Sequence, residues 1–118
     1  MTELVVCLGT GKGTWLHVAK LISEQDWEKI FLITNEFGKE KFDIKKNHEF
    51  ILLDFNKPIS DLVFDLKNKL EGKIKDVEVA LNIISGTGKE HMVILAALLR
   101  LGIGIRLVTY TGAEVKEV

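Results

Sequence analysis

Five short apolar runs, each as long as a β-strand, divide this chain and limit what it can fold into. They lie at residues 4–8, 30–34, 50–55, 77–84 and 105–109. Most are continuous rather than alternating, which is typical of strands that are buried on both faces of a parallel sheet. Parallel strands need crossover connections, so the pattern predicts an α/β fold. At 118 residues, we expect a single domain over residues 1–118.

The segments between these runs carry apolar residues at helical spacing. We expect helices at residues 14–24, 59–70 and 90–101, the last of them apolar on nearly every side. The lysine-rich connection at residues 38–49 can be a short helix or a mobile loop. Residues 113–118 either add a short strand or fray.

The order of elements predicts a doubly wound sheet with helices on both faces. Its five strands would follow the order 3-2-1-4-5, which makes the first and fourth strands central neighbours. Ligands of such sheets bind in the crevice outside the carboxyl ends of the strands at this switch point. Polar residues directly after these two strands are therefore candidates for a ligand site.

The tetrapeptide Gly-Thr-Gly-Lys follows both of them, at residues 9–12 and at residues 86–89. Glycine lets backbone N–H groups approach a ligand closely, and the N-terminus of a following helix favours an anion such as phosphate. Hydroxyls and lysine ammonium groups would add to such a site. The alternative is that the hydroxyls only cap helices and the glycines only make turns. The hydroxyls and cations are supplied by Thr10, Thr14, Ser85, Thr87, Lys12 and Lys89.

Neither copy fits a familiar nucleotide motif. A Walker A loop needs a glycine six positions before its lysine and a hydroxyl residue after it. The dinucleotide fingerprint needs a third glycine. Glu36 follows the second strand and could imitate the ribose-binding acid of that fold, so a dinucleotide site stays an alternative. The residues that break these motifs are Val6, Ile83, Gly13, Glu90, Thr14 and His91.

Composition excludes several classes of function. The formal net charge of −1 gives no overall basic field for duplex DNA. The single cysteine, Cys7, lies in an apolar run and can form neither a disulfide framework nor a cysteine zinc site. No two histidines share a metal-binding spacing, and no apolar run is long enough to span a membrane. We expect a cytoplasmic protein without metal, cofactor or membrane partner.

The stretch NIISGTGKEHM at residues 82–92 resembles a signature of the CRISPR-associated Rossmann-fold (CARF) domains. In that family the fourth strand ends in an Asn-x-Ser/Thr-Gly-Gly-Thr-Lys type loop that opens a long apolar helix. Here Gly88 comes after Thr87, so the order is rearranged. The family's other ligand loop follows the first strand, where residues 9–14 stand. Specific matching residues are confined to these two loops.

The resemblance implies a Rossmann-like homodimer that binds a cyclic oligoadenylate, a second messenger of type III CRISPR defence, across its two-fold axis. The first loop and the start of the final helix would then hold the ring's phosphates and riboses. The ligand-binding residues would be Gly9, Thr10, Gly11, Lys12, Thr14, Ser85, Gly86, Thr87, Gly88, Lys89 and His91.

A stand-alone domain of this family can be a ring nuclease or a non-catalytic sensor or sponge. Cleavage would need no metal, because a ribose 2′-OH attacks the adjacent phosphate in line. Lys89, then Lys12, would stabilise charge on that phosphate, and Thr10 or Thr87 would orient the reacting groups. His91 would act as general acid or base, or simply pack beside its helix. A generic nucleotide- or phosphate-binding module unrelated to CRISPR remains the third alternative.

Overall fold

A computed structural model describes residues 2–118, in which strands and helices largely alternate. The strands are β1 (Glu3–Cys7), β2 (Lys29–Thr34), β3 (His48–Leu52), β4 (Glu78–Asn82), β5 (Gly104–Tyr110) and β6 (Val115–Glu117). The helices are the 3₁₀ turn η1 (Lys12–Thr14), α1 (Trp15–Ser23), α2 (Glu36–Lys41), α3 (Ile59–Leu70) and α4 (Gly88–Arg100). The chain therefore forms an α/β, Rossmann-like fold.

The strands form one sheet of order β3-β2-β1-β4-β5-β6. The predicted order of the first five strands is confirmed, and all of their pairings are parallel. The sheet has a sixth strand beyond the five predicted, because β6 pairs antiparallel with β5. A tight turn makes this pairing possible: Gly112 has a φ of 97°, and the Thr111 N–H donates to the Glu114 carbonyl. The last residues thus form a strand rather than a frayed end.

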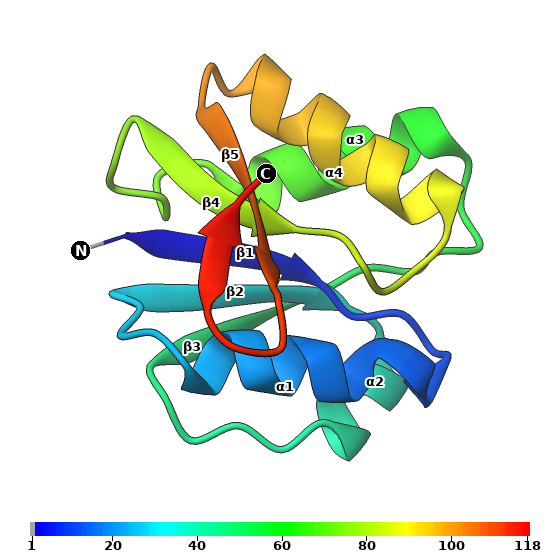
Figure 1. Cartoon of the computed structure of the whole chain (residues 1–118). Coiled ribbons are helices and arrows are strands. Elements are labelled where there is room, and N and C mark those ends of the chain that lie inside the picture. Colours follow the sequence, from blue (N-terminus) through cyan, green and yellow to red (C-terminus); the bar gives the residue numbers. More distant parts are fainter. Residues whose placement is uncertain (1) are drawn as a thin grey trace.

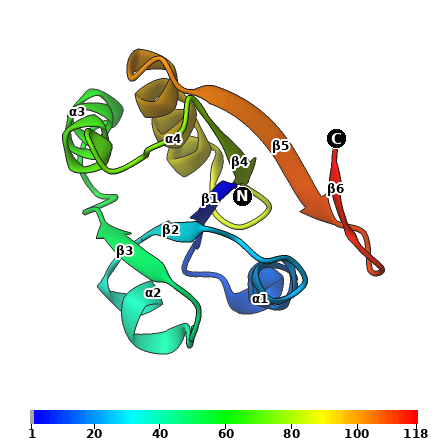
Figure 2. The ribbon, with the colours of Figure 1, turned by 90° about the vertical axis from the view of Figure 1, so that its left-hand side faces the viewer.

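Helices cover both faces of the sheet (Figures 1 and 2). Successive residues of a strand point to opposite faces, so one continuous apolar run serves two cores. In β1, Leu4 and Val6 pack in the core beneath α1, whereas Val5 and Cys7 pack in the core beneath α3 and α4. This explains why the buried strands read as unbroken apolar runs.

The lysine-rich connection divides into two parts. Its first residues belong to α2, which begins after Asn35, and the chain then runs without regular structure as far as β3. The Asn35 side chain accepts a hydrogen bond from the Gly38 N–H (3.0 Å) and so caps α2. Lys46 donates to the carbonyls of Ser23 and Gln25, which fastens the loop to the end of α1.

Helix α4 packs against α3 and the sheet, but it is not buried on every side. Val93, Ile94, Ala97 and Leu98 face the core, whereas Leu99 is exposed. Among residues 2–118, no helix combines the length and the apolar character that crossing a bilayer requires.

Candidate functional site

The two Gly-Thr-Gly-Lys loops meet at the carboxyl ends of β1 and β4. The Gly9 N–H donates to the Ser85 Oγ at 2.9 Å, and the bond is buried. A Cβ on Gly9 would lie 2.7 Å from the Cα of Gly86, so the two backbones touch. The prediction that the loops lie side by side is confirmed, because β1 and β4 are neighbours in the sheet.

A cleft of about 290 Å³ opens where the loops meet. Backbone atoms and small side chains dominate its walls, as expected for a site that recognises a ligand through N–H groups and hydroxyls. Six of the predicted ligand-binding residues line it, together with three residues that were not predicted. The lining residues are Gly9, Thr10, Gly11, Gly13, Thr14, Ile84, Gly86, Thr87 and Glu90.

The second loop is fixed by a capping box at the start of α4. The Thr87 Oγ1 accepts from the Glu90 N–H (3.3 Å), and the Glu90 carboxylate accepts from the Thr87 N–H (2.9 Å). The Thr87 hydroxyl therefore caps a helix, which was the alternative to a direct role in binding. The N–H groups of Gly88 and Lys89 have no hydrogen-bond partner within residues 2–118, so they remain available to a ligand.

The first loop has no such cap. It runs into η1, where neither Gly11 nor Thr14 makes a side-chain capping bond. The Thr10 side chain is exposed at the cleft. The N–H groups of Thr10 and Gly11 find no partner in the described part of the chain. This loop therefore presents more unused donors than the second loop does.

Glu90 is the one charged residue among the three of the cleft lining that were not predicted, the others being Gly13 and Ile84. The spacing Thr87-x-x-Glu90 is a capping-box signature and would have placed this carboxylate at the helix start. The charge of Glu90 also acts on Cys7, which lies below the second loop. Burial is the main cause that raises the pKa of the Cys7 thiol to about 12, and the Glu90 carboxylate is the second cause. Cys7 therefore stays a protonated, buried thiol, as the sequence indicated.

The two predicted cationic residues do not line the cleft. The Lys89 Nζ donates to the Phe55 carbonyl at 2.9 Å. The Lys12 Nζ lies 5.7 Å from the centroid of the Trp15 ring and 5.5 Å from that of Phe37, a cation–π arrangement. Both ammonium groups are thus directed to the margins of the cleft, on the side of β2 and β3.

Ser85 and His91 hold the second loop in place through hydrogen bonds outside the cleft lining. Ser85 is fully buried, and its hydroxyl is engaged by the Gly9 N–H. The His91 Nε2 lies 2.8 Å from the Ser85 carbonyl, which requires a proton on that nitrogen. This contact holds the imidazole at the loop rather than in the cleft lining. Gly88, like Ser85 and His91, belongs to the predicted set but does not line the cleft.

Asn82, the first residue of the NIISGTGKEHM stretch, turns the chain out of β4. Its side-chain amide donates to the Val108 carbonyl (2.8 Å), and its Oδ1 accepts from the Ile84 N–H (3.2 Å). The buried amide therefore ends the strand two residues earlier than the apolar run suggests. The turn that follows Asn82 places Ile84 and Gly86 in the lining of the cleft.

The fold requires glycine at some positions of these loops and not at others. Gly86 has a φ of 103°, and a Cβ there would lie 2.6 Å from the Cys7 Sγ. By contrast, a Cβ on Gly11, Gly13 or Gly88 would meet nothing within 4 Å, and none of the three has a positive φ. Packing does not explain these three glycines.

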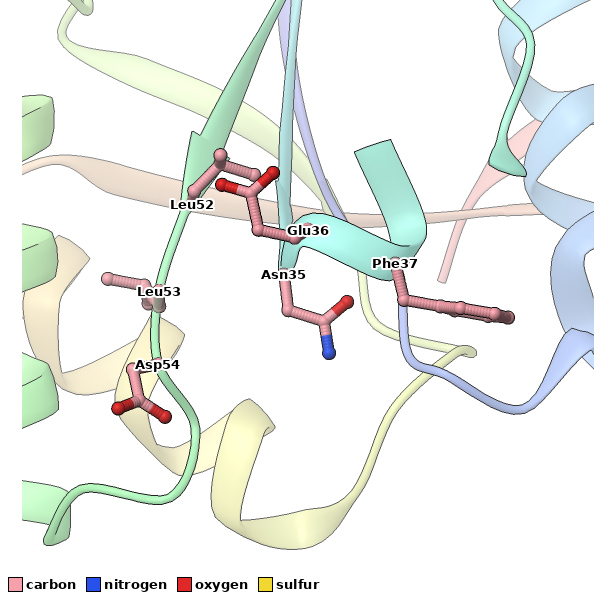
Figure 3. A pocket seen from close by; sticks show the side chains of 6 residues that line it. All are labelled: Asn35, Glu36, Phe37, Leu52, Leu53 and Asp54. Carbon is pink, nitrogen blue, oxygen red and sulfur yellow. The ribbon is translucent and has the colours of Figure 1, made fainter. Parts of the chain in front are cut away.

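A second hollow, of about 390 Å³, lies at the same edge of the sheet, at the ends of β2 and β3 (Figure 3). We call it the β2–β3 hollow. It is lined by Asn35, Glu36, Phe37, Leu52, Leu53 and Asp54. Only Glu36 had been considered from the sequence, because a pocket formed by the ends of two strands has no local motif.

Within residues 2–118, no group of three or more His, Cys, Asp or Glu side chains is arranged to hold a metal ion. A comparison with models of known protein families finds no match for the chain, and a comparison with curated proteins finds none either.

Proposed function

We propose that the chain binds a cyclic oligoadenylate, with ring phosphates held against the cleft between the two loops. One observation carries this proposal: two glycine loops touch at the switch point of the sheet and keep unpaired N–H groups there. Glycines that the fold does not require, at positions 11, 13 and 88, fit a phosphate backbone that comes close to the chain.

The charge of the cleft favours sharing the ligand between two copies. Glu90 places a carboxylate in the cleft, and both lysines lie outside its lining. One protomer therefore offers few positive charges to a ring of phosphates, whereas a two-fold dimer would double the N–H donors and the marginal lysines. Ile84, which lines the cleft, is half exposed (50%), and an exposed apolar side chain there suits a surface that a second copy covers.

Binding without rapid cleavage is the form of this function that the geometry supports best. In-line attack needs a positive group at the phosphate, yet the Lys89 Nζ is held by the Phe55 carbonyl and the Lys12 Nζ by two rings. His91, the candidate acid or base, is tied to the Ser85 carbonyl. A sensor or sponge needs neither group to move.

The test is incubation of the purified protein with labelled cyclic tetra- and hexa-adenylate in EDTA, reading both binding and product. We expect a complex with an intact ring and a dimer by size exclusion. Release of a linear product with a 2′,3′-cyclic phosphate would make the chain a ring nuclease instead. No binding of either ring at micromolar protein would refute the proposal.

The variant Gly11→Val tests the cleft itself. Gly11 has an extended backbone (φ −76°, ψ 120°) with open space around it, so valine should fold normally. A valine there would fill the space that the ligand backbone needs, and we expect ring binding to fall at least about tenfold. The variant Asn68→Ala, an exposed change on α3, serves as the control.

A further inference from the structure

We propose that the β2–β3 hollow receives the adenine base of the ligand whose phosphate lies on the two loops. The choice of adenine depends on the proposed function, but the existence of a second subsite follows from the hollow itself. The ligand would then span four adjacent strand ends, with its anionic part on β1 and β4 and its base on β2 and β3.

Hydrogen bonds between neighbouring strands place the hollow beside the cleft. The Thr34 Oγ1 donates to the Leu8 carbonyl (2.7 Å), and the Leu53 N–H donates to the Thr34 carbonyl (2.9 Å). The residues that follow, Gly9, Asn35 and Asp54, therefore leave three adjacent strands at one edge of the sheet. A ligand anchored at Gly9 meets the hollow at the next strand.

The walls of the hollow suit a flat, largely apolar group. Figure 3 shows Asn35 and Phe37 on the β2 side, with Leu52, Leu53 and Asp54 on the β3 side. Its volume of about 390 Å³ falls within the range of pockets that bury small ligands, about 300–1,000 Å³. Leu52 is partly exposed and supplies apolar surface for a face of a base, whereas the Leu53 side chain is buried in the core below.

The polar atoms of the hollow complement the hydrogen-bonding edge of adenine. The Asn35 Oδ1 is engaged by the Gly38 N–H, which leaves the amide NH₂ of Asn35 as a donor. Asp54 uses one oxygen for the Asn56 N–H (3.1 Å) and keeps the other as an acceptor. Adenine presents an amino donor next to a ring-nitrogen acceptor, so it matches one free acceptor and one free donor.

Charge decides which end of the ligand enters the hollow. Glu36 and Asp54 bring two carboxylates to it, and these would repel a phosphate. The Glu36 carboxylate is exposed, where it can accept from ribose hydroxyls. The neutral nucleoside therefore enters the hollow, and the phosphate stays on the glycine loops.

The position of the two lysines fits a ligand that crosses between the sites. Lys12 lies by Phe37, a residue of the hollow, and Lys89 bonds the carbonyl of Phe55, the residue after Asp54. Each Gly-Thr-Gly-Lys loop thus sends its ammonium group to one flank of the hollow. Phosphates that join a base there to the cleft would pass between these two cations.

Photo-crosslinking tests the location of the base directly. A cyclic tetra-adenylate that carries 8-azidoadenine is bound and irradiated, and the adducts are mapped by peptide mass spectrometry. We expect adducts in residues 35–37 or 52–54. Adducts confined to residues 9–14 and 84–90 would overturn the inference and leave the cleft proposal intact.

The variant Asn35→Ser tests base recognition without changing charge. Serine caps a helix about as well as asparagine, so α2 and the melting temperature should be preserved. The amide donor is lost, and we expect about tenfold weaker ring binding, with less preference for adenine over hypoxanthine rings. Asn68→Ser, an exposed change on α3, should bind as the parent does.

The outcomes separate the two proposals. If Gly11→Val prevents ring binding and Asn35→Ser has no effect, the hollow is not a base site but the cleft proposal stands. If no ring binds but adenosine monophosphate does, with Asn35→Ser weakening it, the hollow stands and the ring proposal fails. If neither ligand binds the parent protein, both proposals are refuted.

Discussion

The same four residues, Gly-Thr-Gly-Lys, take two different structures in this molecule. At residues 9–12 they form an uncapped entry into a 3₁₀ turn, with an exposed threonine. At residues 86–89 they form a left-handed glycine, a threonine N-cap and the first turn of a long helix. The residues that follow decide the difference, because only the second copy has a glutamate three positions after its threonine.

This comparison separates what a glycine loop does for the fold from what it offers to a ligand. The second copy uses its hydroxyl and one N–H within the capping box, and its first glycine fills a crowded position above Cys7. The first copy uses the Gly9 N–H to hold Ser85, but its threonine hydroxyl and the N–H groups of Thr10 and Gly11 have no partner within residues 2–118. We therefore infer that the second loop is mainly a rigid support and that the first provides more of the donors for a ligand.

The largest expected effect comes from Gly86→Ala. The new Cβ would lie 2.6 Å from the Cys7 Sγ and 2.7 Å from the Glu90 carboxylate, at a φ that alanine avoids. We expect the free energy of unfolding to fall by about 3 kcal/mol in urea titrations. Gly88→Ala, two residues on, should change it by less than about 1 kcal/mol. Equal losses in the two variants would contradict the assignment of different roles.

The thiol below the second loop should make stability depend on pH. The native pKa of Cys7 is raised to about 12 from an ordinary value of 9.0, so the unfolded thiol ionises first as the pH rises. This contribution to stability is complete below pH 9 and is lost between pH 9 and pH 12. The loss is about 1.4 kcal/mol per pH unit. Cys7→Ala should remove that slope, and an unchanged slope would show that other groups cause it.

The two threonines should respond differently to truncation. Thr87→Ala removes the hydroxyl that caps α4, and we expect a loss of about 1 kcal/mol in the free energy of unfolding. Thr10→Ala should leave stability within about 0.5 kcal/mol, since its side chain is exposed and caps nothing. Ligand affinity should show the opposite order. A larger stability loss in Thr10→Ala would reverse our reading of the loops.

Glu90→Gln should also have only a small effect on stability. Glutamine also completes a capping box, so unfolding should change by less than about 0.5 kcal/mol. Removal of a negative charge from the cleft should nevertheless tighten the binding of a phosphate ligand severalfold at low salt. Weaker binding at low salt would mean that the carboxylate itself contacts the ligand.

The sequence predicted the meeting of the loops, because the order of strands follows from topology and each loop follows a recognisable strand. Local chemistry could also have revealed the capping box, since Thr87 and Glu90 stand at the required spacing. The end of β4 at Asn82 was harder to predict. The apolar residues Ile83 and Ile84 continue the run, and the Asn82 amide is anchored by the carbonyl of Val108, a residue distant in the sequence.

The directions of Lys12 and Lys89 could not be predicted. A long side chain takes the direction that its partners set, and those partners come from other parts of the chain: the Phe37 ring and the Phe55 carbonyl. The β2–β3 hollow has the same origin, since Asn35 and Asp54 are brought together only by the pairing of β2 with β3.

The hydrogen bond from the Gly9 N–H to the Ser85 hydroxyl joins residues 76 positions apart. It links the loop that leads into α1, on one face of the sheet, to the loop that leads into α4, on the other. The two walls of the cleft are therefore bonded directly to each other, as well as leading into helices on opposite faces. A ligand held by both walls would stiffen the contact between the two loops. Ligand binding would then change the rigidity of the domain rather than its shape.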